Sequence, residues 1–269
     1  MTGICRMLEF LTALKVNNDR QWFGVHKEEY NDIRRQCLEE VGVLIAEIAR
    51  FDPHLAGVAP EQCVYSIYRD IRFSADKSPF KTHFGVVLGH GGKKCKEAAY
   101  YLHIDPDGCA FFSGVWFPEM PVLRFLRRNI YDNLDEFLEI IDSPAFKSEY
   151  PGLIGESLKT LPKGYPKDCP HPEIFKMKEF LVQKKYKKSL FAAENWQKQV
   201  AKDAQLAKPF NDFLNYAFEE LHTQLWSVRN MGRDCTKKAI LSSRNYTKKG
   251  RLCQKLNRTK SLKRLHILL

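Results

Sequence analysis

The residues best suited to chemistry lie in one short segment that interleaves charged and apolar side chains just before a proline. Between Tyr68 and Lys81 the sequence reads Tyr-Arg-Asp-Ile-Arg-Phe-Ser-Ala-Asp-Lys-Ser-Pro-Phe-Lys. A solvated face would ordinarily carry its ions without Ile71 and Phe73 between them, so we expect these charges at the edge of a packed core, where ions need partners. Arginine and lysine in that setting are suited to holding a carboxylate or a phosphate. The segment is therefore the best candidate site, although it names no reaction.

Strand geometry would divide these side chains between two faces. Arg69 shares one face with Ile71 and Phe73, whereas Asp70 and Arg72 lie on the other, close enough for a lateral ion pair. A hairpin at 76–79 would bring the next strand alongside, and the anion would then be surrounded by Arg72, Lys81, His83 and His103. We expect six residues of this predicted sheet to bind the anionic ligand: Arg69, Arg72, Ser74, Lys77, Lys81 and Tyr101.

Other interpretations of the same residues stay open. The charges can satisfy one another as a structural ion-pair network that pins the hairpin in an interaction protein. An enzyme acting on an anionic substrate would need a general acid or base, for which the candidates are Asp70, Asp76, His103 and Glu119. No His, Asp or Glu spacing indicates a metal site, and the turn at 89–92 lacks the pattern of a phosphate-binding loop. We expect neither metal nor cofactor.

The elements that must position these residues fall into three zones of one α+β domain over residues 1–228. Residues 1–52 are predicted helical, with a break at Asn17-Asn18-Asp19. Residues 63–117 are predicted to form an antiparallel meander, packed by the N-terminal and C-terminal helices, because turn formers separate β-prone runs. Its predicted strands are 64–74, 80–88, 98–104 and 109–117.

The third zone, residues 118–225, is predicted to be helical again. Pro118 suits a first helical position, with Glu119 in the first turn, where a carboxylate complements the helix dipole. Further helices are predicted at 134–141 and 194–221, separated by a proline-punctuated loop at 161–168.

Composition bounds the class of protein. A chain of 269 residues with 44% hydrophobic content can bury a substantial core. No run approaches the roughly 18 apolar residues of a membrane span, and the first residues lack the apolar core of a secretion signal. We therefore expect no membrane partner, a cytoplasmic location and reduced thiols, because the eight cysteines form no C-x-x-C pair. The oligomeric state is left open.

The net charge of +11 belongs to the C-terminal end of the chain. Residues 229–269 contain 13 Lys or Arg and a single acidic residue, Asp234, which leaves 30 basic and 31 acidic residues before them. We expect this basic tail to be flexible and disordered. The alternative is that the tail binds nucleic acid or another acidic surface by neutralising phosphates.

Several motifs together resemble the domain-of-unknown-function family 2461, over about Leu8 to Glu220. They are Asn17-Asn18 with Trp22-Phe23 and Lys27, the segment 68–81, and Trp116-x-Pro118-Glu119. Leu123-x-x-x-Arg127 also fits, and Arg127 joins the residues expected to bind the ligand. The N-terminal segment before these motifs is shorter than is usual in that family, and the tail after about Leu225 has no counterpart in the family's pattern. The resemblance implies a mixed α/β fold and a cytoplasmic location, and it implies no reaction because the family is uncharacterised.

Overall fold

The computed structural model describes the backbone of residues 1–166 and 168–244, and side chains as far as Glu220. The helices are α1 (Gly3–Val16), α2 (Arg20–Val25), α3 (Lys27–Ala49), α4 (Pro60–Cys63), α5 (Met120–Asp132), α6 (Leu134–Ile141), α7 (Pro144–Glu149), α8 (Pro172–Lys176) and α9 (Trp196–Arg244). The strands are β1 (Phe84–Leu88), β2 (Ala99–Ile104), β3 (Cys109–Val115) and β4 (Phe180–Tyr186). Short 3-10 turns lie at Pro53–Leu55, Gly92–Lys94 and Lys188–Ala192.

The four strands form one antiparallel sheet in the order β1-β2-β3-β4. Its register places Val87 opposite Tyr101 and Tyr101 opposite Phe112, so these three side chains share a face. The predicted α+β class and the antiparallel meander are thereby confirmed, as are the break between α1 and α2 and the helix at Leu134–Ile141.

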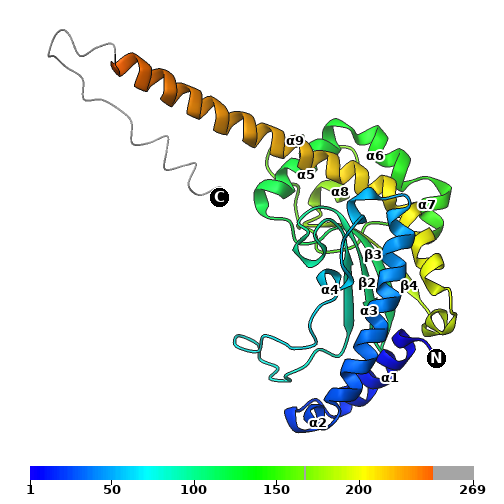
Figure 1. The fold of residues 1–269 in the computed structure, drawn as a ribbon. Coiled ribbons are helices and arrows are strands. Elements are labelled where there is room, and N and C mark those ends of the chain that lie inside the picture. The colour runs from blue at the N-terminus through cyan, green and yellow to red at the C-terminus, as the bar shows by residue number, and fades with distance from the viewer. Residues whose placement is uncertain (167, 245–269) are drawn as a thin grey trace.

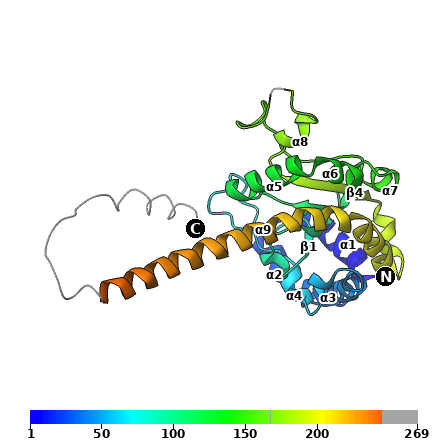
Figure 2. The same ribbon diagram turned by 90° about the horizontal axis from the view of Figure 1, so that it is seen from above.

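Helices cover one face of this sheet, which we call the core face. On β2 and β3 it carries Tyr100, Leu102 and Phe111, all fully buried. The Ser113 hydroxyl donates to the side-chain amide oxygen of Asn211 on α9 at 2.8 Å, and the Tyr100 hydroxyl donates to the Asp52 carboxylate just beyond α3 at 3.0 Å. Figures 1 and 2 show α1 and α3 packed together beside the strands and α9 crossing them before it extends away from the body.

The predicted first strand is wrong. Residues 64–74 hold only isolated bridges, Val64 to Val86 and Tyr68 to Phe80, and regular pairing begins at Phe84 rather than at residue 80. Local side chains take the backbone N–H groups that a ladder would use, because Asp70 accepts from the Arg72 amide at 3.2 Å and Asp76 from the Ser78 amide at 2.9 Å. The segment is a long turn-rich loop, which projects at the lower left of Figure 1.

The fourth strand comes from the zone predicted to be helical. Residues Phe180–Tyr186 form β4 and pair with β3, so the sheet draws on residues beyond 117. Phe180 and Val182 alternate toward the core, but lysines at 184, 185 and 187 and the lack of turn formers before Phe180 obscure that pattern.

Two helix boundaries also differ from the prediction. Helix α5 begins at Met120 with Pro121 in its first turn, which leaves Glu119 at the capping position with no side-chain capping bond. Helix α9 continues to Arg244 instead of ending near Leu221, so residues 229–244 of the predicted tail are helical, and residues 245–269 lie outside the described part. Within the described residues, no helix combines the length and apolar character needed to cross a membrane.

Candidate functional site

The charged residues of the predicted hairpin, 69–77, form ion pairs with one another. The Arg69 guanidinium pairs with Asp76 and donates to the Ser74 hydroxyl at 3.3 Å. Arg72 donates to both oxygens of Asp70, at 2.9 and 2.6 Å, as the spacing of these two residues predicted. Because the segment is not a strand, Arg69 and Ser74 meet instead of lying on opposite faces.

These bonds favour the ionised carboxylates. The Ser78 hydroxyl and amide, followed by Arg69, hold the pKa of Asp76 well below its usual range, and the side chain and amide of Arg72 lower the pKa of Asp70. The Arg72 and Asp70 side chains are 77% and 59% exposed, so their pair contributes little to stability. This geometry agrees with a local network that shapes the loop.

The two lysines of the segment bind backbone carbonyls. Lys77 donates to the Ile71 carbonyl at 3.0 Å on the exposed loop. Lys81 donates to the Ser66 carbonyl at 2.8 Å, and its ammonium lies 5.2 Å from the centre of the Tyr65 ring. Lys81 thus points back toward the sheet, away from the Arg69 and Arg72 pairs.

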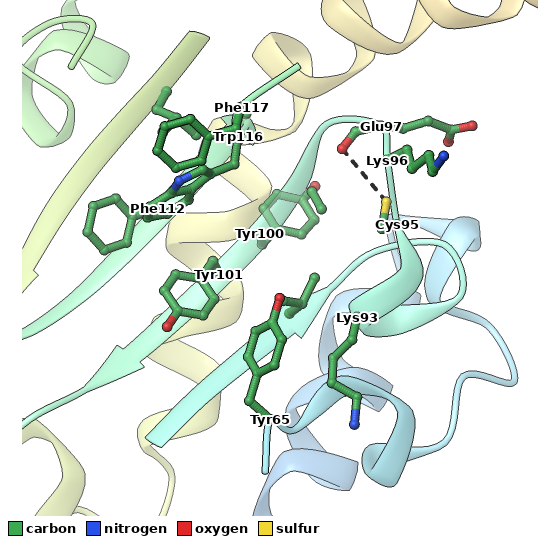
Figure 3. A pocket seen from close by; sticks show the side chains of 14 residues that line it. Tyr65, Lys93, Cys95, Lys96, Glu97, Tyr100, Tyr101, Phe112, Trp116 and Phe117 are labelled. Atoms are coloured by element: carbon green, nitrogen blue, oxygen red, sulfur yellow. Dashed lines mark hydrogen bonds between the residues drawn. The ribbon is translucent and has the colours of Figure 1, made fainter. Parts of the chain in front are cut away.

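A cavity of about 430 Å³ lies on the other face of the sheet, which we call the outer face. Figure 3 shows the rings of Tyr101, Phe112 and Trp116 gathered on one side of this cavity and Tyr65 with Lys93 on the other. The ring centres of Tyr101 and Phe112 each lie within 5.6 Å of that of Trp116. The complete lining is Tyr65, Val87, Lys93, Cys95, Lys96, Glu97, Ala99, Tyr100, Tyr101, Phe112, Gly114, Trp116, Phe117 and Leu181.

Two backbone features shape this wall. Gly85 lies beside Tyr101, where an added Cβ would come within 2.5 Å of the tyrosine hydroxyl oxygen. Phe117 has φ of 43°, a left-handed conformation that is costly for an aromatic residue, and its side chain is exposed at the cavity mouth. The fold therefore keeps space for the Tyr101 hydroxyl and holds an apolar ring out of the core.

Two lysines bring positive charge to this side of the cavity: Lys93 lines it, and Lys81 lies outside the lining, beside the ring of Tyr65, which lines it. Lys93 donates to the Glu61 and Val64 carbonyls at 3.0 and 2.7 Å. Burial lowers the pKa of Lys81, and the charge of Lys93 lowers it further. In the described part of the chain, neither lysine forms a salt bridge with a carboxylate.

Two histidines continue this row on the outer face. The ring centres of His83 and His103 are 4.8 Å apart. His103 Nδ1 lies 3.2 Å from the Tyr101 hydroxyl, and its Nε2 lies 3.7 Å from an Asp105 carboxylate oxygen. Lys81, His83 and His103 thus come together as the sequence suggested, whereas Arg72 lies with Asp70.

The remaining sequence candidates lie elsewhere. Glu119 is exposed at the start of α5, and Asp70 and Asp76 belong to the loop network. Arg127 is 3% exposed and donates to the Met177 carbonyl at 2.6 and 3.2 Å, so its guanidinium is a core group. Of the four acid-base candidates, only His103 contacts a residue of the cavity wall.

Sequence reasoning missed five site residues: Tyr65, Lys93, Phe112, Trp116 and Phe117. The adjacent aromatics Trp116-Phe117 at a strand end were the available signal, because two neighbouring residues of a strand cannot both face the core. Lys93 gave no signal, since it lies on a 3-10 turn within a run of lysines. No cluster of three or more potential metal ligands occurs among the residues whose positions are described.

Comparisons with known proteins bear on the family alone. The model of a family described as conserved hypothetical protein (DUF2461) matches residues 6–213. No curated protein and no solved structure shows significant similarity to the chain. The match spans α1 to the middle of α9 and includes all four strands. It confirms the resemblance found in the motifs, and the chain belongs to the DUF2461 family.

Proposed function

We propose that this protein binds a small anionic molecule that carries a flat unsaturated group, in the cavity on the outer face. The observation that carries the proposal is the combination of an aromatic wall with Lys93 in the cavity lining and Lys81 beside the lining residue Tyr65. Each ammonium has three donors, and their carbonyl bonds leave two free on Lys81 and one on Lys93. An anion would therefore gain charge-assisted hydrogen bonds without displacing a carboxylate.

The aromatic wall favours a ligand with a ring. Trp116 is 46% exposed and Phe117 72% exposed, so both present faces on which a flat group can stack. Stacking of a base on an aromatic side chain contributes about 1–3 kcal/mol. A ring held there would direct its anionic substituent toward Tyr65 and the lysines across the cavity.

This proposal places the anion beside Lys81, one of the residues expected from sequence, and leaves Arg69, Arg72, Ser74 and Lys77 to the loop network. The structural interpretation of that network is thus compatible with ligand binding nearby. Catalysis stays an alternative that His103 alone among the sequence candidates supports, because of its bond to Tyr101. We keep the cytoplasm as the proposed location.

The test is ligand-dependent thermal stabilisation of the full chain. The probes are phenyl phosphate, a nucleoside monophosphate, benzoate and inorganic phosphate, each at millimolar concentration. A probe at 100 times its Kd should stabilise the folded state by about 2.7 kcal/mol. We expect the ring-bearing anions to stabilise the protein more than inorganic phosphate does. Trp116→Ala should remove this difference.

Matched variants locate the binding. Lys81→Met and Lys93→Met keep the aliphatic stems and should each weaken phenyl phosphate binding by about tenfold, the loss of one charge-assisted hydrogen bond. Arg72→Ala removes a cation of the exposed loop and should leave Kd unchanged. Absence of stabilisation by every anion, or equal losses in Arg72→Ala and Lys81→Met, would contradict the proposal.

A further inference from the structure

The outer face holds a chain of hydrogen-bonding groups that reaches the cavity through Tyr101. Asp105 lies in the turn between β2 and β3, His103 lies on β2, and Tyr101 lies two residues earlier on the same face. Burial, followed by the charges of Tyr65 and Asp105, raises the pKa of Tyr101 to about 12, so its hydroxyl keeps its proton. That hydroxyl can donate to His103 Nδ1, which leaves the hydrogen of a neutral ring on Nε2, toward Asp105.

The groups around the histidine pair keep both rings uncharged in the free protein. Burial lowers the pKa of His83, and His103 and Lys81 lower it further while Asp105 opposes them. Burial also lowers the pKa of His103, against the effect of Asp105. From α1, Lys15 acts on the same turn, because its ammonium pairs with Asp107 and interacts with Asp105.

We propose that the anionic group of the ligand is a phosphate monoester, and that His103 takes up a proton at Nδ1 when this ligand binds, which turns the Tyr101 hydroxyl toward a phosphate oxygen. In the free protein the tyrosine O–H donates to Nδ1. Once Nδ1 carries a proton it donates to the tyrosine oxygen, and the O–H hydrogen is released to the ligand. One proton enters from solvent, and no covalent bond to the ligand is made or broken.

The charge of the ligand decides between phosphate and carboxylate. This inference rests on the proposed function, in which Lys81 and Lys93 face the anion. A carboxylate brings one negative charge, which the two lysines already offset. A phosphate monoester brings nearly two at pH 7 and above, and a dianion close to an imidazole favours its charged form. Proton uptake by His103 is therefore expected with phosphate and not with a monoanion.

The experiment measures the affinity of phenyl phosphate for the full chain between pH 8.5 and 7.0, a range in which the probe stays largely dianionic. Because the pKa of His103 is higher in the complex, binding should tighten as the pH falls, by about tenfold per unit at most for one proton. We expect at least a fivefold change over this range. Phenyl sulfate, which has the same shape and one charge, should change less than twofold.

Two variants and one direct observation identify the coupled groups. His103→Gln removes the titrating ring and should abolish the pH dependence, and Tyr101→Phe, which keeps the aromatic ring but removes the hydroxyl that links His103 to the phosphate, should reduce it. In the unmodified protein, the NMR titration of the His103 ring should shift to higher pH when phenyl phosphate is added, which requires no variant to fold.

The possible failures are distinguishable. If phenyl phosphate does not bind at any pH, the proposed function and this inference are both overturned. If it binds through Lys81 with equal affinity at pH 7.0 and 8.5, and the His103 titration does not move, only the inference fails. A pH dependence that persists in His103→Gln would assign the proton to another group and would also overturn it.

Discussion

Adjacent arginines on α5 show how strongly burial decides the role of a residue. Arg127 is 3% exposed and donates twice to the Met177 carbonyl, whereas the Arg128 side chain is 72% exposed and pairs with Asp132 one turn later. Burial lowers the pKa of Arg127, with the nearby Tyr165 opposing that shift. A buried guanidinium that donates twice to one carbonyl fixes the position of that carbonyl and of the loop that carries it.

Arg127→Ala should therefore destabilise the protein, by about 2 kcal/mol, because it leaves the buried Met177 carbonyl without its donor and removes packed aliphatic surface. Arg128→Ala is the matched control and should cost no more than about 0.5 kcal/mol, the value of an exposed helical ion pair. Urea denaturation of both variants measures the difference. Equal and small losses would mean that the Arg127 bonds contribute nothing beyond a surface pair.

Some contacts of individual residues could be predicted from the sequence, and others could not. Residue type and spacing correctly indicated that Asp70 and Arg72 could form an ion pair, but they did not indicate that this pair would keep Arg72 apart from Lys81 and the histidines. It could not indicate that Arg127 is buried, because the partner is a backbone carbonyl fifty residues away that has no signature in the sequence. Tyr101 stood among the expected ligand-binding residues, and the structure adds its contact with His103 and its place on the cavity wall.

At the scale of elements, the loop between α4 and β1 is held at its base by Asn18. The Asn18 amide donates to the Phe80 carbonyl at 3.0 Å and accepts from the Phe80 amide at 3.1 Å. The Phe80 ring is buried and stacks on Phe23 of α2, with ring centres 4.1 Å apart. The break between α1 and α2 therefore positions Lys81, the next residue in the chain.

Asn18→Ala should loosen the base of this loop, because the buried Phe80 backbone groups lose both partners. We expect local opening to become easier by about 1–2 kcal/mol, which amide hydrogen exchange at Phe80 and Lys81 would report. Asn17→Ala is the control, since the Asn17 side chain donates only to the exposed Ala13 carbonyl of its own helix. If exchange at Phe80 responded equally to both variants, the two-bond clamp would not be what holds the loop.

Elements with strong local signals were predictable, and those that depend on competing interactions were not. The helical zone before residue 52 and the strands at 98–104 and 109–117 were predicted nearly to their ends, because periodicity and turn residues agree there. The segment 64–74 has the composition of a strand, but the side chains of Ser66 and Asp70 accept from the backbone amides of Tyr68 and Arg72. Strand β4 was missed because its pairing with β3 is decided by tertiary packing on α9 and not by its own lysine-rich sequence.

At the scale of the whole molecule, two parts of the chain could attract anions, and experiments must distinguish them. The cavity combines an aromatic wall with Lys93 in its lining and Lys81 beside Tyr65, whereas the sequence of residues 229–269 contains 13 Lys or Arg and one Asp. The rest of the chain is close to neutral, with 30 basic and 31 acidic residues. Any association with a long polyanion should therefore depend on the C-terminal residues and not on the cavity.

Truncation tests this division and, with it, the proposed domain boundary at residue 228. The family match ends at residue 213 and the last described core residue is Phe218, so a chain of residues 1–228 should keep its Tm within about 2 °C. It should also keep its affinity for phenyl phosphate. A chain ending at residue 206 would lack the buried Phe210 and Leu214, and it should not fold.

Binding to single-stranded RNA should respond to the same truncations in graded steps. Residues 229–244 hold 5 of the 13 basic residues, so a chain of 1–244 should show a salt dependence between those of the full chain and of 1–228. Each phosphate no longer neutralised reduces the slope of log K against log salt by about 0.7. If the chain of residues 1–228 still bound RNA with an unchanged slope of log K against log salt, the RNA-binding site would lie within residues 1–228 and not in the C-terminal residues. A loss of phenyl phosphate binding in that folded chain would instead show that the cavity needs the C-terminal residues.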